Sequence, residues 1–128
     1  MLKKFLFLIG VTLIILTTIY IKSFNNTPNH LYKIISTKNW EQSQLQDNLV
    51  LPSMDDDFIH LSTKKQLEKI INKFWKNETE FFVLKLDVKK LPGKLTFEFN
   101  PGGSQKYYHL YDGYIPITSI ISVSKVTK

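Results

Sequence analysis

Two histidines inside apolar, strand-like stretches are the residues of this chain best placed to do chemistry. His60 stands in the run Phe58-Ile59-His60-Leu61-Ser62, and His109 stands in Tyr108-His109-Leu110-Tyr111. A titratable side chain in a buried segment costs free energy unless it is paired or used. We therefore expect both histidines at one shared site, where an imidazole could bind a phosphate or a ribose, or act as a general base near neutral pH.

Each histidine also has a purely structural interpretation, which stays open at this point. His60 could be bonded to the backbone or to a carboxylate of the acidic run Asp55-Asp56-Asp57. The aromatic neighbours of His109 could stack on a base or a nicotinamide ring, or could be ordinary core side chains. The acidic run lacks the spacing of a Ca²⁺-binding loop. The three histidines lack the spacing of zinc ligands, so we expect no metal site.

Composition narrows the class of protein. The chain has 128 residues and no Cys, which excludes a disulfide scaffold, a thiolate metal site and a Cys nucleophile. Its 17 basic residues are all Lys, and its formal net charge is +6. Because recognition of bases and phosphates favours Arg, and because the lysines are interleaved with acids, the charge pattern argues against nucleic-acid binding.

The N-terminal segment indicates where the domain is held. Phe5–Ile21 is an uncharged stretch that would rise about 25 Å as a helix, close to the hydrocarbon thickness of a bilayer. Its exit has no small-residue cleavage pattern, which favours an uncleaved anchor over cleaved secretion. Lys3 and Lys4 favour a cytoplasmic N-terminus with the domain outside. We divide the chain into an anchor and linker, 1–29, and one domain, 30–128.

The elements that would position the histidines follow from the apolar pattern. Residues 31–35 predict a first strand, and a helix over about 36–46 should place Trp40 and Leu45 on its inner side. Residues 58–61 predict the short strand that carries His60.

A second helix is indicated after this strand. Thr63 and Gln66 have the spacing of a capping box. Apolar residues then recur at helical spacing, with Lys on the opposite face. These apolar residues are Leu67, Ile70, Ile71, Phe74 and Trp75.

The second half of the chain has a strand pattern. Residues 81–86 form an apolar run typical of a central strand covered on both faces. The alternation over 95–100 predicts a half-buried strand with Phe97 and Phe99 on one side and Glu98 on the other. Further turns are predicted at 91–93, 100–103 and 112–113, and further strands at 107–111 and 117–123. Early helices and late strands indicate the α+β class.

The ordered residues of this domain also resemble a known family. The set is Tyr32-x-Ile34, Trp40, Phe58-Ile59-His60-x-Ser62, Phe74, Leu86-Asp87, Leu91, Glu98 and His109-Leu110-Tyr111. It is similar to that of the small bacterial and plant family called domain of unknown function 952, over residues 31–123. The resemblance implies an ADP-ribosyltransferase-like fold: two helices and a curved, split, mostly antiparallel sheet with a cleft that holds NAD in catalytic relatives.

The resemblance also implies roles for particular residues. Glu98 would be the catalytic carboxylate that binds a ribose 2′-hydroxyl and stabilises an oxocarbenium-like centre, unless it is an ordinary solvated strand residue. The expected ligand-binding residues are His60, His109, Tyr111, Ser62 and Lys33. Lys33 stands where members usually carry His, and could pair with a phosphate as a point charge.

Three functions remain open from the sequence. The first is a membrane-anchored domain that binds a nucleotide-type or other small ligand without turnover. The second is a transferase that uses Glu98 and transfers either an ADP-ribosyl group, with NAD, or a phosphoryl group. The third is an interaction domain without a small ligand.

Overall fold

The computed structural model describes Lys3 and residues 27–128. The predicted anchor, Phe5–Ile21, lies outside the described residues, and the anchor therefore stays a prediction. Among the residues that are described, no helix combines the length and the apolar character needed to cross a bilayer.

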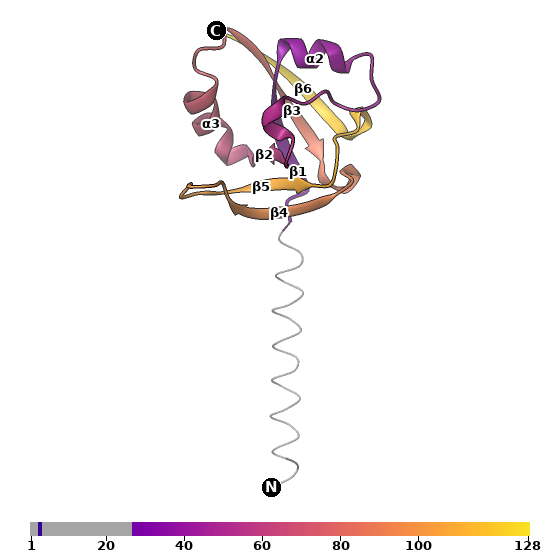
Figure 1. The fold of residues 1–128 in the computed structure, drawn as a ribbon, viewed down its shortest axis with the longest axis vertical. Helices are drawn as coiled ribbons and strands as arrows, with labels where there is room; N and C mark the ends of the chain where they lie inside the picture. The colour runs from indigo at the N-terminus through magenta and orange to yellow at the C-terminus, as the bar shows by residue number, and fades with distance from the viewer. Residues whose placement is uncertain (1–2, 4–26) are drawn as a thin grey trace.

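The described domain contains the helices and strands expected of the α+β class (Figure 1). In chain order they are β1 (His30–Ser36), α2 (Thr37–Ser43), β2 (Ile59–Leu61), α3 (Leu67–Phe74), β3 (Glu80–Asp87), β4 (Lys94–Phe99), β5 (Lys106–Tyr111) and β6 (Ile120–Thr127). Short 3₁₀ turns lie at Ser53–Asp55, Lys64–Gln66, Val88–Lys90 and Ile117–Ser119.

The strands form two three-stranded antiparallel sheets, in the orders β1-β3-β6 and β2-β5-β4. Figure 1 shows β4 and β5 running across the domain beside the other sheet. Backbone hydrogen bonds between Tyr32 and Ser62 connect the two sheets where β1 passes the end of β2. The sheet is therefore split, with one point of backbone contact between its halves.

The hydrophobic core lies between the two sheets. Its fully or nearly buried members are Leu31, Ile35, Leu49, Ile59, Leu61, Leu84, Leu86, Leu110 and Ile115. As expected, β3 is the central strand of its sheet and is covered on both faces: Phe82 contacts Trp40 of α2, and Phe81 contacts Trp75 at the end of α3. Alternation along β1 puts Lys33 on the same, core-facing side as Leu31 and Ile35.

The predicted starts of both helices are confirmed, but the predicted end of the first helix is wrong. Ser36 caps α2 by accepting from the backbone N–H of Asn39, and Thr63 and Gln66 form the predicted capping box before α3. The first helix ends at Ser43 rather than near residue 46, because the Ser43 hydroxyl bonds the Asn39 carbonyl and the Val50 N–H and turns the chain. Leu45 is consequently exposed, not packed.

The predicted sides of β4 are confirmed, but the burial of its Phe side is less than a half-buried strand implies. Phe97 and Phe99 lie on the side opposite Glu98, yet they are 50% and 54% exposed. The β4–β5 hairpin extends past the core at its turn end, so the side chains of Phe97 and Phe99 have no second sheet packed against them. Phe97 packs on Tyr108, and the Lys106 ammonium lies 5.3 Å from the Phe99 ring. The last strand also starts later than expected, at Ile120, because residues 117–119 form a 3₁₀ turn.

Two turn glycines have positive φ but different surroundings, and this difference makes a matched prediction. Gly93 has φ +119°, and a Cβ there would lie 2.6 Å from the Tyr111 carbonyl oxygen. Gly102 has φ +72°, and a Cβ there would meet nothing within 4 Å. We expect Gly102→Ala to reduce the free energy of unfolding by about 1 kcal/mol and Gly93→Ala by about 3 kcal/mol or more, measured by urea denaturation. Equal effects would contradict the close approach at Gly93.

Candidate functional site

The strand register brings the predicted site residues to one face of the β2-β5-β4 sheet. His60 of β2 lies directly opposite His109 of β5, and His109 lies opposite Thr96 of β4. Directly opposed residues of antiparallel strands point to the same side, and Glu98 and Tyr111 follow at even spacing on that side. The two imidazole centroids are 5.4 Å apart. We call this side, opposite the core, the outer face.

Glu98 is held in place by two donors on the neighbouring strand. The Tyr111 hydroxyl donates to Oε1 of Glu98, and Nδ1 of His109 lies 2.9 Å from the same oxygen. The Glu98 side chain nevertheless stays 36% exposed. The carboxylate is thus oriented by the protein and open to a ligand.

The same contacts determine the ionisation of this pair. The hydrogen bond from Tyr111, followed by that from His109, lowers the pKa of Glu98 below its ordinary value. The bond to Glu98 in turn raises the pKa of the Tyr111 hydroxyl. At neutral pH the site therefore presents an ionised carboxylate, which only accepts hydrogen bonds, beside a neutral phenol.

His109 is the buried support of this arrangement. Its second ring nitrogen, Nε2, lies 2.7 Å from Oδ1 of Asn100, and Phe58 stacks on the ring at a centroid distance of 4.0 Å. The side chain is only 1% exposed. Because both ring nitrogens already have protein partners, His109 is placed to orient Glu98 rather than to touch a ligand itself.

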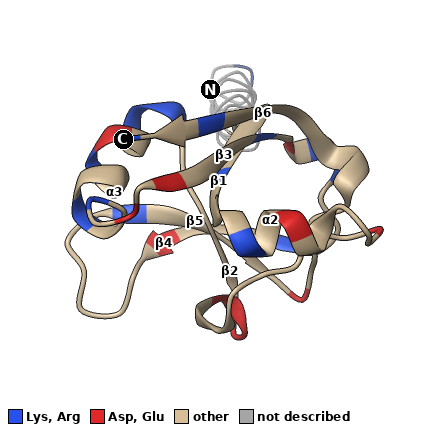
Figure 2. Ribbon diagram, turned by 90° about the horizontal axis from the view of Figure 1, so that it is seen from above, with Lys and Arg blue, Asp and Glu red and all other residues tan. Residues whose placement is uncertain are grey.

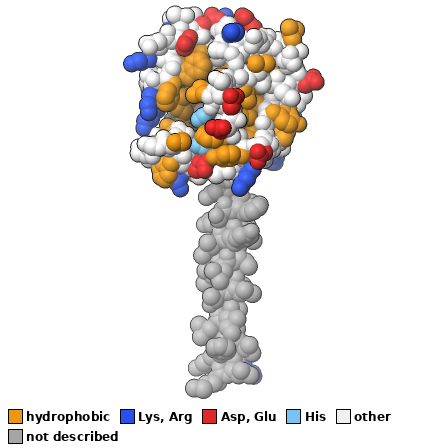
Figure 3. All heavy atoms as spheres, in the orientation of Figure 1, with side chains coloured by type: hydrophobic (Ala, Val, Ile, Leu, Met, Phe, Trp, Pro, Cys, Tyr) orange, Lys and Arg blue, Asp and Glu red, His pale blue; other side chains and the backbone are white. Residues whose placement is uncertain are grey.

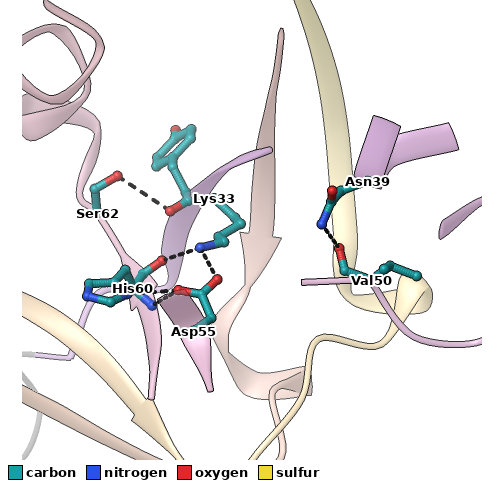
Figure 4. Close-up of polar contacts among 7 residues, drawn as sticks. Lys33, Asn39, Val50, Asp55, His60 and Ser62 are labelled. Carbon is teal, nitrogen blue, oxygen red and sulfur yellow. Dashed lines mark hydrogen bonds and ion pairs between the residues drawn. The ribbon is translucent and has the colours of Figure 1, made fainter. Parts of the chain in front are cut away.

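His60 has the opposite character, since one of its ring nitrogens is free. Nδ1 lies 2.8 Å from Oδ1 of Asp55, and the ring is 33% exposed (Figure 4). Among the described residues, Nε2 of His60 takes no hydrogen bond. A buried carboxylate that orients an imidazole and leaves Nε2 open is the arrangement needed for ligand binding or proton transfer. Figure 3 shows histidine atoms (pale blue) reaching the surface between hydrophobic and acidic side chains.

Asp55 is itself held by Lys33, behind the outer face. The Lys33 ammonium lies 2.6 Å from Oδ2 of Asp55 and donates to the His60 carbonyl oxygen at 3.2 Å (Figure 4). Burial lowers the pKa of Lys33, and the Asp55 charge opposes this only in part. Burial alone would raise the pKa of Asp55, but the hydrogen bond from His60 and the charge of Lys33 outweigh it and lower that pKa.

Two of the expected ligand-binding residues are not brought to the outer face. Lys33 is buried on the core-facing side of β1, because its charge is satisfied there by Asp55. Ser62 is also buried, and its hydroxyl lies 3.4 Å from the Tyr32 carbonyl oxygen. The structure does bring His60, His109, Glu98 and Tyr111 together. Among the described residues, no cluster of His, Asp or Glu is arranged to hold a metal ion.

Three supporting residues were not singled out from the sequence. Asn100 is two residues after Glu98, so the strand alternation already placed both on one side. Asp55 was one of three candidate acids, and nothing in the sequence distinguished it from Asp56 or Asp57. Phe58 was read as part of a strand, and its stacking on His109 depends on how β2 and β5 pair.

The buried Lys33–Asp55 pair predicts strong energetic coupling. Asp55→Asn leaves the buried ammonium without a countercharge and should reduce the free energy of unfolding by about 3–5 kcal/mol. In the double variant with Lys33→Met, the loss should be smaller than the sum of the two single losses by more than about 1 kcal/mol. Chemical denaturation of the four proteins measures this coupling.

The exposed pair Lys125–Glu80, at 3.1 Å, is the matched control. The cycle Lys125→Met with Glu80→Gln should give a coupling below about 1 kcal/mol, since solvent screens that pair. Additive losses at Lys33 and Asp55 would contradict the arrangement seen at the split of the sheet.

The lowered pKa of Asp55 also predicts a pH dependence. A carboxyl whose pKa is lower in the folded state contributes stability that is complete above its ordinary value of 3.8 and is lost as the pH falls through the folded value. The difference in unfolding free energy between the wild type and Asp55→Asn should therefore be constant from neutral pH to about pH 5 and should narrow below about pH 4. Urea denaturation at a series of pH values tests this, and an unchanged difference at acid pH would refute it.

Comparison with known proteins agrees with this fold. Protein CC0527 from Caulobacter crescentus, in its crystal structure, is 24% identical, with a TM-score of 0.65 over 75% of this chain and 84% of that one. Its solution NMR structure gives a TM-score of 0.66 over 78% of this chain and 86% of that one, at the same 24% identity. At this identity the likeness shows the shared fold alone. No curated protein matches the chain significantly.

The family resemblance drawn from the ordered residues is confirmed by a family model. The model described as Protein of unknown function (DUF952) matches residues 34–123, a range that begins within β1, ends within β6 and contains the residues of the outer face. The chain belongs to this family, Protein of unknown function (DUF952).

Proposed function

We propose that the domain binds a small, nucleotide-type ligand on its outer face, with Glu98 and His60 as the residues that contact it. The observation that carries this proposal is the state of Glu98. Two hydrogen bonds hold the carboxylate, its pKa is lowered, and more than a third of the side chain is exposed. A merely solvated surface glutamate has no need of two fixed donors.

The chemistry of the two groups limits the class of ligand. An ionised carboxylate accepts hydrogen bonds and cannot donate them, so it selects hydroxyl or N–H donors such as the vicinal hydroxyls of a ribose. His60 offers a single free nitrogen that can donate to a phosphate or accept from a hydroxyl. A sugar linked to a phosphate supplies both kinds of partner within a short distance.

An ADP-ribosyltransferase-like fold is part of this proposal. The split sheet, its two antiparallel halves and the glutamate on a strand of the outer face support it. In the alternative function, the domain transfers an ADP-ribosyl group. Glu98 would then stabilise the positive charge that develops on the ribose as nicotinamide leaves, and the lowered pKa of Glu98 favours this role.

We also propose that Phe5–Ile21 anchors the chain in a membrane with the domain on the outer side. The support is the uncharged stretch itself and the lysines that precede it.

Ligand-induced stabilisation tests the proposed function. We expect NAD or ADP-ribose, at about 100 times its dissociation constant, to stabilise the full chain by about 2.7 kcal/mol. This corresponds to a rise in melting temperature of about 10–20 °C for a domain of this size. Glu98→Gln and His60→Ala should each abolish the rise while the unliganded protein stays folded, as judged by circular dichroism.

Glu80→Gln is the matched control for Glu98→Gln. Glu80 is a strand glutamate of similar side-chain exposure, 34%, that also has fixed partners, Thr37 and Lys125. It should keep the full thermal shift. Release of nicotinamide that is lost in Glu98→Gln would identify the transferase. If neither compound shifts the melting temperature, the interaction domain without a ligand is the better account.

A further inference from the structure

A hollow borders the outer face, between α3 and the turn that joins β4 to β5. Its volume is about 300 Å³, which is the lower end of the range for small-ligand sites. Its lining includes Lys69, Lys73 and Phe74 from α3, Asn100 and Gly102 from the turn, and Tyr107 from β5.

The charge of this lining is positive. Lys69 and Lys73 are separated by one helical turn and project from the same side of α3, and Figure 2 shows the basic residues (blue) on this helix. No Asp or Glu is among the described residues that line the hollow. The one acid beside them on α3, Glu68, lines the shallower neighbouring depression with the same two lysines and Lys65.

The two ammonium groups are partly oriented by the protein. Lys69 donates to the Gln105 side chain at 3.0 Å, which leaves two of its three N–H donors for a ligand. The Lys73 ammonium lies 5.0 Å from the centroid of the Phe74 ring, within the range of a cation–π contact. This contact places the charge at the border of the hollow.

The turn on the other side leaves room for an anion. Asn100-Pro101-Gly102-Gly103 closes with a 2.8 Å hydrogen bond from the Gly103 N–H to the Asn100 carbonyl, and Gly102 has φ +72°. Pro followed by a glycine of positive φ is the type II turn. Nothing lies within 4 Å of the position of a Cβ at Gly102, so a ligand can approach the backbone there.

Residues of the β4–β5 hairpin connect this hollow with the Glu98 site. Tyr107 lies directly opposite Glu98 in the β4–β5 register, and the two side chains share the outer face. Asn100 lines the hollow and also contacts His109, which in turn orients Glu98. A ligand that donates a hydroxyl to Glu98 can therefore extend past Tyr107 toward Lys69 and Lys73.

We propose that this hollow binds a phosphate group of the same ligand, so that the outer face recognises a phosphorylated sugar in two parts, hydroxyls at Glu98 and phosphate at the lysines. The assignment to one ligand rests on the proposed function, whereas binding of a phosphate in the hollow is tested without it.

The test is a titration of the ¹⁵N-labelled full chain, in a maltoside detergent, with inorganic pyrophosphate. We expect the amide signals of Gly102, Gly103 and Tyr107 to shift. The double variant Lys69→Gln/Lys73→Gln should weaken this binding at least about tenfold. The matched control Lys89→Gln/Lys90→Gln removes the same charge from exposed lysines of another element and should leave the affinity unchanged.

The outcomes separate this proposal from the one on which it rests. Glu98→Gln should retain pyrophosphate binding and lose ADP-ribose binding; if pyrophosphate binds but ADP-ribose does not, the hollow stands and the nucleotide ligand falls. Equal weakening in both double variants, shifts scattered over other lysines, or no shift would each overturn the proposal. Shifts caused by phosphatidic acid in the micelle but not by pyrophosphate would overturn the soluble ligand and assign the phosphate to a lipid headgroup.

Discussion

The burial of one carboxylate, that of Asp55, is the constraint on which the arrangement of this domain depends. Lys33 points from β1 into the space between the two sheets, where an unpaired ammonium would be very costly. The loop before β2 folds back so that Asp55 meets Lys33, and the same carboxylate binds both the ring and the backbone N–H of His60. One buried group thus joins the two sheets beside the Tyr32–Ser62 contact, and the orientation of His60 follows from it.

The Glu98 network depends instead on the register of a hairpin. Glu98 lies on β4 with Asn100 directly after the strand end, and His109 and Tyr111 lie on β5. The members of each pair are two positions apart and contact the other pair. A shift of the register by one residue would turn all of one strand's side chains to the opposite face. The type II turn at residues 100–103, part of the loop that joins the two strands, favours the observed register, because its Pro and positive-φ Gly restrict the loop geometry.

The sequence predicted most of the local structure and predicted that the site residues lie together, but it did not predict how deeply each of them is buried. Some signals involve only residues that are close together in the chain, and each of these predicted the right element. They are the helix caps at Ser36 and Thr63 and the apolar run at 81–86. The sides of β4 were right but its burial was overestimated, because alternation shows that the two faces of a strand differ and does not show how far the core extends along it. Phe97 and Phe99 lie on the core-facing side of their sheet but beyond the end of the core. Lys33 was interpreted from its residue type as a phosphate ligand, but it is buried, because residue type does not show which side of β1 faces the core.

The position of Lys33 changes how the first strand contributes to the site. The family resemblance leads one to expect a His there, and on the outer face such a residue would touch the ligand directly. Lys33 instead acts through Asp55: together with the hydrogen bond from His60, its charge lowers the pKa of that carboxyl, and the carboxylate holds Nδ1 of His60. Because the positive charge of Lys33 is paired with the carboxylate of Asp55, it adds little net attraction for a phosphate at His60. Any strong phosphate contact must then come from exposed cations. In the described part of the chain these include Lys94, on the same side of β4 as Glu98, and the lysines of α3.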